Sequence, residues 1–287
     1  MRQLTFAIAT LLLAPAALAQ TAQLQRIGGY SSGLGLGSIE ISAFDAATRQ
    51  VFAVNGVNST FDIINLSNPA APTLVQRVST AQFGSPNSVA VANGIVAVAI
   101  QDATPQNNGR VAFYSTAGVL LGNVPVGALP DMVTFSPDGR LALVANEGEP
   151  NTNYTSDPEG SVSIIDLSAG VAAATVRQVR FNEFNVGGPR NAELPAAVRI
   201  FGLNASVAQD LEPEYITVTA DGRTAFVSLQ EANALAVIDI ASATVSRILA
   251  LGFKNHNVAG AALDPSDRDG ASNGQAISIR NVPVLGV

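Results

Sequence analysis

Two acidic stretches of the chain have residue types and spacing that could bind a metal ion. Residues 131–159 and 212–231 each begin with acids beside a proline, pass through a short apolar strand pattern and then supply further acids. Crowded carboxylates repel one another unless protons or cations intervene, and oxygen-only ligand sets suit Ca²⁺ or another hard divalent cation. The predicted ligands are Asp131, Glu147, Glu149, Asp157, Glu159, Glu212, Glu214 and Glu231. The alternative is that some of these acids are solvated loop residues that point outward.

A third acidic stretch near the end of the chain is a weaker metal candidate, through Asp264, Asp267 and Asp269. It is not an EF-hand, because counting back from the glycine that follows places Pro265 at the first ligand position and Ala276 at the twelfth. A cation loop of another kind and a simple Asx-rich turn both stay open.

Nucleophilic catalysis finds no support in the sequence. The pattern G-x-S-x-G occurs at residues 29–33 and 270–274, but neither copy lies between a strand and a helix, as a nucleophile elbow requires. His256 is the sole histidine and precedes Ser272, which argues against a serine triad. It fits a polar loop better than a ligand position, although the ligand chemistry of histidine keeps that alternative open. The catalytic residues, if the protein is an enzyme, are therefore unknown at this stage.

A repeated strand-turn-strand unit positions the acids. The turn residues Asp45, Asn93 and Asp138 are 48 and 45 residues apart, which is close to the period of four-stranded propeller blades. Fourth strands fit residues 74–78, 119–124, 174–181 and 244–251. The sequence therefore predicts an all-β, β-propeller-like fold of four to five blades, either closed or an incomplete ring.

The predicted domain, residues 39–287, has blades near 39–80, 86–127, 129–181 and 211–251. Residues 182–210 lack the repeat and form an insertion, and residues 252–287 hold the acidic loop and a short strand. In a propeller, the first turn of each blade lies at the bottom and the second loop returns to the top. This geometry places Asp45, Asp138 and Asp221 in bottom turns and the predicted ligands, together with Asp102, at the top face.

The start of the chain resembles an export signal. Arg2 precedes an apolar run over residues 4–14 and the small-residue pattern of residues 17–19. We therefore expect a signal peptide at 1–19, a flexible segment at 20–38, and export to the periplasm or outside the cell. This run is too short to span a bilayer, and no later apolar run approaches membrane-spanning length. The net charge of −7 and the absence of cysteine disfavour nucleic acid as a partner and exclude disulfides.

Several segments are similar to the choice-of-anchor I family. They are LPDMVTFSPDGRLALVANEGEPN, YTSDPEGSVSIIDL, DLEPEYITVTADGRTAFVSLQEANALAVIDI and LDPSDRDG. The resemblance implies an exported bacterial β-propeller-like protein, of a kind often labelled alkaline phosphatase or mesenchyme-specific cell surface glycoprotein. It also implies that this chain is a short or truncated member, since longer relatives include some fused to 5′-nucleotidase-like modules.

Two functions follow as hypotheses. The first is an exported binding or scaffold module whose acidic top face binds a cation and recruits an unknown protein or small-molecule ligand. The second is a metal-dependent phosphoesterase, alkaline phosphatase-like or 5′-nucleotidase-associated, in which bound cations activate water. Fold alone cannot choose between them, because propellers host many unrelated activities.

Overall fold

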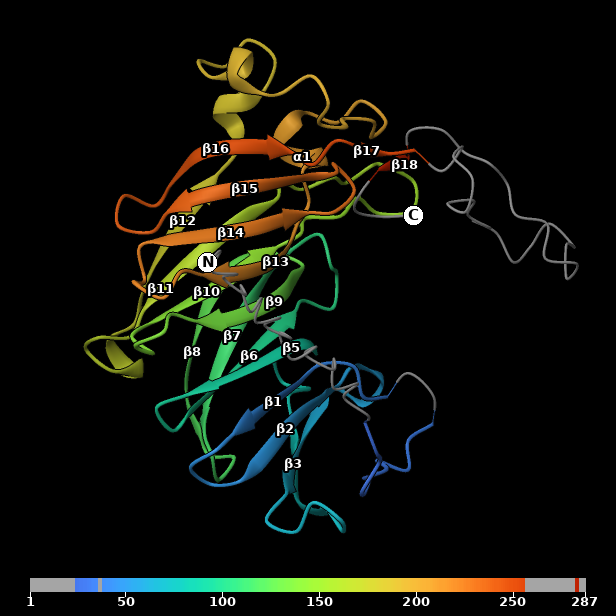
Figure 1. Ribbon diagram of the computed structural model, residues 1–287, viewed down its shortest axis with the longest axis vertical. Coiled ribbons are helices and arrows are strands. Elements are labelled where there is room, and N and C mark those ends of the chain that lie inside the picture. The colour runs from blue at the N-terminus through green and yellow to red at the C-terminus, as the bar shows by residue number, and fades with distance from the viewer. Residues whose placement is uncertain (1–23, 36–37, 256–281, 284–287) are drawn as a thin grey trace, which may run out of the picture.

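The computed structural model describes residues 24–35, 38–255 and 282–283. They form four four-stranded antiparallel sheets (Figure 1). Sheet 1 contains β1 (Ser42–Asp45), β2 (Gln50–Asn55), β3 (Thr60–Asn65) and β4 (Thr73–Ser79). Sheet 2 contains β5 (Ser85–Ala92), β6 (Ile95–Gln101), β7 (Asn108–Ser115) and β8 (Leu120–Ala128).

Sheet 3 contains β9 (Pro130–Phe135), β10 (Leu141–Asn146), β11 (Ser161–Asp166) and β12 (Thr175–Arg180). Sheet 4 contains β13 (Pro213–Val218), β14 (Thr224–Leu229), β15 (Ala234–Asp239) and β16 (Thr244–Ala250). A small pair, β17 (Phe253–Lys254) and β18 (Val282–Pro283), follows. Within each large sheet the strands pair in chain order. These sheets confirm the all-β, propeller-like prediction, including its four fourth strands.

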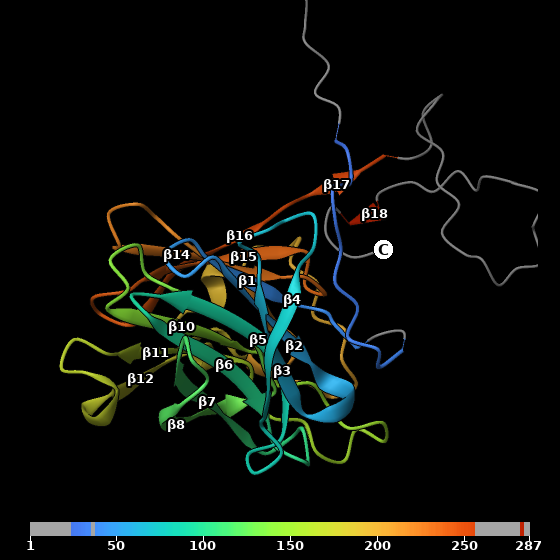
Figure 2. The same cartoon turned by 90° about the horizontal axis from the view of Figure 1, so that it is seen from below.

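The innermost strands β1, β5, β9 and β13 are neighbours in that order (Figures 1 and 2). They line a central cavity of about 470 Å³. The turns between first and second strands lie at one end of the sheets, as expected. There the carboxylates of Asp138 and Asp221 accept hydroxyl bonds from Ser136 and Thr219, each at 2.6 Å. Together with backbone N–H bonds from Arg140 and Arg223, each at 3.1 Å, these bonds lower the pKa of both aspartates.

Apolar side chains between neighbouring sheets form the core. One strand can pack against two neighbouring sheets, because its successive side chains point to opposite faces. In β10, Leu143 and Ala145 face sheet 4, whereas Ala142 and Val144 face sheet 2. The sheets are therefore held together by a continuous series of buried face-to-face contacts.

The insertion after sheet 3 contains short helical turns instead of a blade. They are η3 (Asn182–Phe184), η4 (Asn191–Glu193) and the single-turn helix α1 (Val207–Asp210). Phe184, Val207 and Ala208 are buried in the core cluster between sheets 3 and 4. The insertion is therefore packed onto the sheets at the place where the predicted acidic loops emerge.

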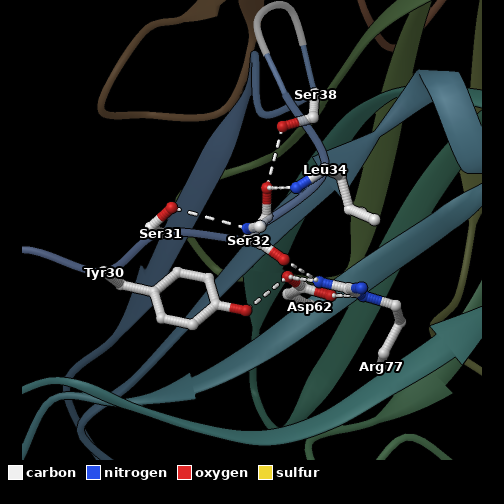
Figure 3. Close-up of polar contacts among 8 residues, drawn as sticks. Tyr30, Ser31, Ser32, Leu34, Ser38, Asp62 and Arg77 are labelled. Atoms are coloured by element: carbon white, nitrogen blue, oxygen red, sulfur yellow. Dashed lines mark hydrogen bonds and ion pairs between the residues drawn. The ribbon is translucent and has the colours of Figure 1, made fainter.

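The segment before β1 is bound to the outer face of sheet 1 (Figure 3). The fully buried carboxylate of Asp62 accepts two bonds from the Arg77 guanidinium, at 2.6 and 2.9 Å, and one from the Tyr30 hydroxyl at 2.8 Å. Arg77 also donates to the Ser32 carbonyl at 3.1 Å. The sequence predicts a flexible segment over residues 20–38, and these contacts anchor part of it to the sheet.

The expected signal peptide at 1–19 lies outside the described residues, as do His256, Asp264, Asp267 and Asp269. These predictions stay expectations.

Leu143→Ala tests the packing between sheets 3 and 4. Leu143 is fully buried, so removing its side chain leaves a cavity, and we expect the free energy of unfolding to fall by about 2–5 kcal/mol. The matched control is Leu121→Ala on β8, whose side chain is 43% exposed and whose loss we expect to cost less than about 1 kcal/mol. Urea unfolding followed by circular dichroism measures both, and equal effects would contradict this packing.

Candidate binding cleft

The loop between β10 and β11, residues 147–160, is held in one shape by hydrogen bonds within the loop. The Asn151 side-chain oxygen accepts N–H bonds from Thr155 at 2.8 Å and from Ser156 at 3.2 Å. Gly148 has a φ of 77°, and a Cβ there would lie 2.9 Å from the Glu159 carbonyl carbon. Only glycine therefore allows the two ends of this loop to approach so closely.

The helix α1 holds the same loop from the other side. Gln209 donates to the Asp157 carbonyl at 2.6 Å, and the Gly160 N–H donates to the Ala208 carbonyl at 2.9 Å. A capping box between Ser206 and Gln209 starts the helix. The fixed loop and the fixed helix thus form two walls of a cleft.

This acidic cleft has a volume of about 410 Å³. Its lining includes two exposed aromatic rings, Tyr154 and Phe201, and five carboxyl groups, those of Glu149, Asp157, Asp210, Glu212 and Glu231. No arginine, lysine or histidine of the described residues lines it. Arg199 is nearby, with its guanidinium 4.7 Å from the centre of the Phe201 ring.

A second acidic group lies beside the cleft, where the inner strands begin. Asp131 and Glu214 occupy equivalent positions in sheets 3 and 4. Asp131 lies two residues before Val133, which pairs with the fourth residue of β10. Glu214 lies two residues before Ile216, which pairs with the fourth residue of β14. By the same count, the equivalent residues are Glu40 in sheet 1 and Asn87 in sheet 2. Asp131 is close enough to Glu40 and Glu149 for both charges to raise its pKa.

Glu147 connects the two groups electrostatically. Burial raises its pKa from the ordinary 4.5 to about 9, and the charges of Glu149, Asp131, Glu231 and Glu212 add to the shift. Burial likewise raises the pKa of Glu212 to about 8, with Glu231 the largest charged contributor, and that of Asp131 to about 6. At neutral pH and without a cation, Glu147 and Glu212 therefore hold protons.

Not every predicted ligand joins this cluster. Burial raises the pKa of Glu214 and of Asp157, which both belong to it. Glu159 faces away, since its carboxylate accepts a bond from Asn182 and lies 3.8 Å from Arg180. Asp102 is also separate, because it accepts bonds from the Thr104 N–H and the Asn107 side chain.

Two members of the cluster were missed by the sequence analysis. Glu40 could have been found, because Ile39-Glu40-Ile41 aligns with Pro130-Asp131-Met132 once the strand register is known. Asp210 belongs to the insertion, which has no repeat to compare. Its buried carboxylate accepts N–H bonds from Phe201 and Gly202, and so holds the second wall of the cleft in place.

The donor chemistry suits a hard cation, but the arrangement does not yet form a metal site. Asp157 Oδ1 and Glu231 Oε2 are buried oxygen atoms without a hydrogen-bond partner, as cation ligands would be. Within residues 24–35, 38–255 and 282–283, however, no three His, Cys, Asp or Glu side chains are grouped so that they could hold a metal ion. The carboxyl groups would need to rotate towards one another to bind one.

The raised pKa of Glu147 predicts a pH dependence of stability. The folded protein keeps this proton up to about pH 9, whereas the unfolded chain releases it near pH 4.5. The unfolding free energy therefore falls as the pH rises through this window. In chelator, we expect Glu147→Gln to reduce the fall between pH 5 and pH 9 by more than about 1 kcal/mol. Urea unfolding at pH 5, 7 and 9 measures it, and identical pH profiles for mutant and wild type would refute the assignment.

Comparisons with solved structures find similar folds at low sequence identity. The chain is similar to the β-propeller domain of Myceliophteria thermophila Cps50 (Swd1), with 12% identity, a TM-score of 0.48, and coverage of 74% of this chain and 55% of that one. A functionally unknown protein from Desulfotomaculum acetoxidans has 14% identity, a TM-score of 0.49 and coverages of 74% and 56%. Kuenenia stuttgartiensis hydrazine synthase has 12% identity, a TM-score of 0.43 and coverages of 70% and 64%. The chain thus spans less than two thirds of each.

Comparison with curated proteins finds no match. None of the described helices is long and apolar enough to cross a membrane. The choice-of-anchor I domain model matches residues 40–287, which include all four sheets and the whole acidic cleft. The chain therefore belongs to the choice-of-anchor I family.

Proposed function

We propose that this protein is an exported β-propeller module that binds a ligand or partner protein in its acidic cleft, with a hard divalent cation among the carboxylates. The observation that carries the proposal is the cleft of about 410 Å³ with its five carboxyl groups. Concentrating acids there costs free energy, because burial and mutual repulsion raise the pKa of Glu212 to about 8 and that of neighbouring Glu147 to about 9. A cation bound between them would remove this cost.

The residues that would hold the cation are the ones whose charges act on one another most. They are Glu147, Glu149, Glu212 and Glu231, with Asp131 and Glu214 beside them. The buried, unpartnered Glu231 Oε2 supports this choice. Ca²⁺ fits best among common cations, because it accepts six to eight oxygen ligands in flexible geometry.

The aromatic rings beside the carboxylates indicate what else the cleft can bind. Tyr154 and Phe201 are 49% and 57% exposed, and rings of this kind supply contact area at small entropic cost. A ligand that reaches both rings and the cation would be held by packing and by charge. Both a protein segment and a small molecule fit this description.

Export is part of the proposal because of the sequence before the fold. Arg2, the apolar residues 4–14 and the small residues 17–19 have the order of a secretory signal. Extracellular and periplasmic fluids also supply Ca²⁺ at concentrations that weak carboxylate sites can use.

A phosphoesterase is less well supported. Phosphate is an anion and is usually bound by arginine, by backbone N–H groups or by metal ions. Because no basic residue of the described chain lines the cleft, a phosphate group would depend entirely on bound metal. The binding module is therefore the function that the cleft supports best.

Calcium titration of the chelator-treated protein tests the cation. We expect saturable heat on calorimetry and a rise in melting temperature, because Ca²⁺ binds only the folded state. Glu147→Gln and Glu212→Gln each remove one ligand charge and should weaken binding at least about tenfold. Glu193→Gln is the matched control, since Glu193 is exposed and pairs with Arg190 outside the cleft.

Two results would count against the proposal. If neither heat nor stabilisation appears up to millimolar Ca²⁺ or Mg²⁺, the proposed cation site is wrong. If an aryl phosphate is hydrolysed by the wild type, and both chelator and Glu212→Gln abolish that activity, the phosphoesterase replaces the binding module.

A further inference from the structure

Residues 24–35, which we call the strap, lie across a face of sheet 1 that has the pattern of a contact between sheets. The side chains of β2 and β3 that point away from sheet 2 are those of Val51, Ala53 and Ile64. The equivalent residues of sheet 3 pack in the core cluster shared with sheet 2 and are Ala142, Val144 and Ile165. In sheet 1, the strap occupies the position that a neighbouring sheet has in sheet 3.

The strap is fixed to this face mainly at one point (Figure 3). The Tyr30 hydroxyl donates to the buried carboxylate of Asp62 at 2.8 Å, and Arg77 donates to the Ser32 carbonyl at 3.1 Å. Among residues 24–35 and 38–255, no backbone–backbone hydrogen bond joins the strap to sheet 1. The strap is therefore held by a few side-chain contacts and not as a further strand of the sheet.

The packing beneath the strap is incomplete. An apolar cavity of about 330 Å³ lies between the strap and the sheet, with Ile27 and Tyr30 on one side and Val51 and Ile64 on the other. Ile27 is 67% exposed, so its side chain leaves most of its surface in water. The closed strap thus gains little from apolar contact, because atoms that line a cavity lack partners on one side.

The same face also contains buried polar atoms that the strap does not satisfy. Asn55 pairs with Thr60 on this face, two residues beyond the pair of Ala53 with Asp62. Asn55 is 0% exposed. Within the described part of the chain, its side-chain nitrogen and oxygen and the Thr60 hydroxyl have no hydrogen-bond partner. Such atoms raise the free energy of the closed state, and contact with water in an open state would lower it.

We propose that the strap opens from sheet 1 while the four sheets stay folded. A segment with few buried apolar contacts opens locally at a lower free energy than the whole protein unfolds. The Tyr30–Asp62 hydrogen bond is then the latch that keeps the strap closed. The strap is a removable cover that controls access to the face of Val51, Ala53 and Ile64. This inference is independent of what the acidic cleft binds.

Thiol labelling of single-cysteine variants tests the proposal, because the chain itself has no cysteine. Ile64→Cys introduces a thiol beneath the strap, at a side chain that is 5% exposed. Ile63→Cys is the matched control, since Ile63 is 1% exposed and packs in the core cluster between sheets 1 and 2. When reclosing is faster than labelling, the rate follows the fraction of open molecules. We expect Ile64→Cys to be labelled at least about tenfold faster than Ile63→Cys.

Removing the latch provides the second test. Added to Ile64→Cys, Tyr30→Phe should speed labelling at least about tenfold, because it deletes a hydrogen bond to a charged group. The rate for Ile63→Cys should not change. Ser31→Ala is the control within the strap, since the exposed Ser31 hydroxyl bonds only to the Gly33 N–H, and it should leave both rates unchanged.

Two results would overturn the proposal, provided that circular dichroism verifies that each variant is folded. Equal labelling rates for Ile64→Cys and Ile63→Cys would mean that the strap opens only when the sheets separate. If Tyr30→Phe speeds both thiols equally, or neither of them, the Tyr30–Asp62 bond is not a latch of the strap.

Discussion

Contact between the apolar faces of successive sheets is the constraint on which this protein depends. Each interior strand must supply two faces, as β10 does with Leu143 towards sheet 4 and Val144 towards sheet 2. Antiparallel strands joined by short turns meet this requirement with a period of two residues. Once the faces are buried in this way, all inner strands begin at one end of the sheets, and the loops that carry the acids emerge at that end.

The acidic cleft follows from that arrangement and from the insertion. Sheets 3 and 4 bring the loop over residues 147–160 close to the beginning of β13, while α1 packs its apolar side into the core between the same two sheets. The carboxyl groups are thereby removed from water and placed near one another, which raises the pKa of Glu147 most of all. Folding stabilises this unfavourable arrangement, and a ligand that brings positive charge can recover the cost.

Much of the fold and part of the acidic cluster could be predicted from the sequence, because the relevant signals are local. Turns such as Asn93-Gly94 and apolar alternation identify the strands, and the repeat places Asp131 and Glu214 at equivalent positions. The orientations and contacts of individual side chains could not be predicted. Glu159 turns towards Asn182 and Arg180, and Asp210 enters the site from the non-repeating insertion. Both depend on how the insertion packs, which no periodic pattern encodes.

The anchoring of the segment before β1 could not be predicted from the sequence either. Nothing in the spacing of Tyr30 and Asp62 links them, because their contact joins residues 32 positions apart through a sheet face. That contact matters for the architecture, since it covers the face of sheet 1 that points away from sheet 2.

The most direct test of the central claim is the metal content of the protein. The protein should be purified without chelator, dialysed against Ca²⁺ and then passed through a desalting column before elemental analysis. The account predicts divalent metal retained by the wild type and depleted from a Glu147→Gln, Glu212→Gln double variant that is still folded. Wild-type protein without metal, or equal metal in the double variant, would contradict the claim that these carboxylates form a cation site.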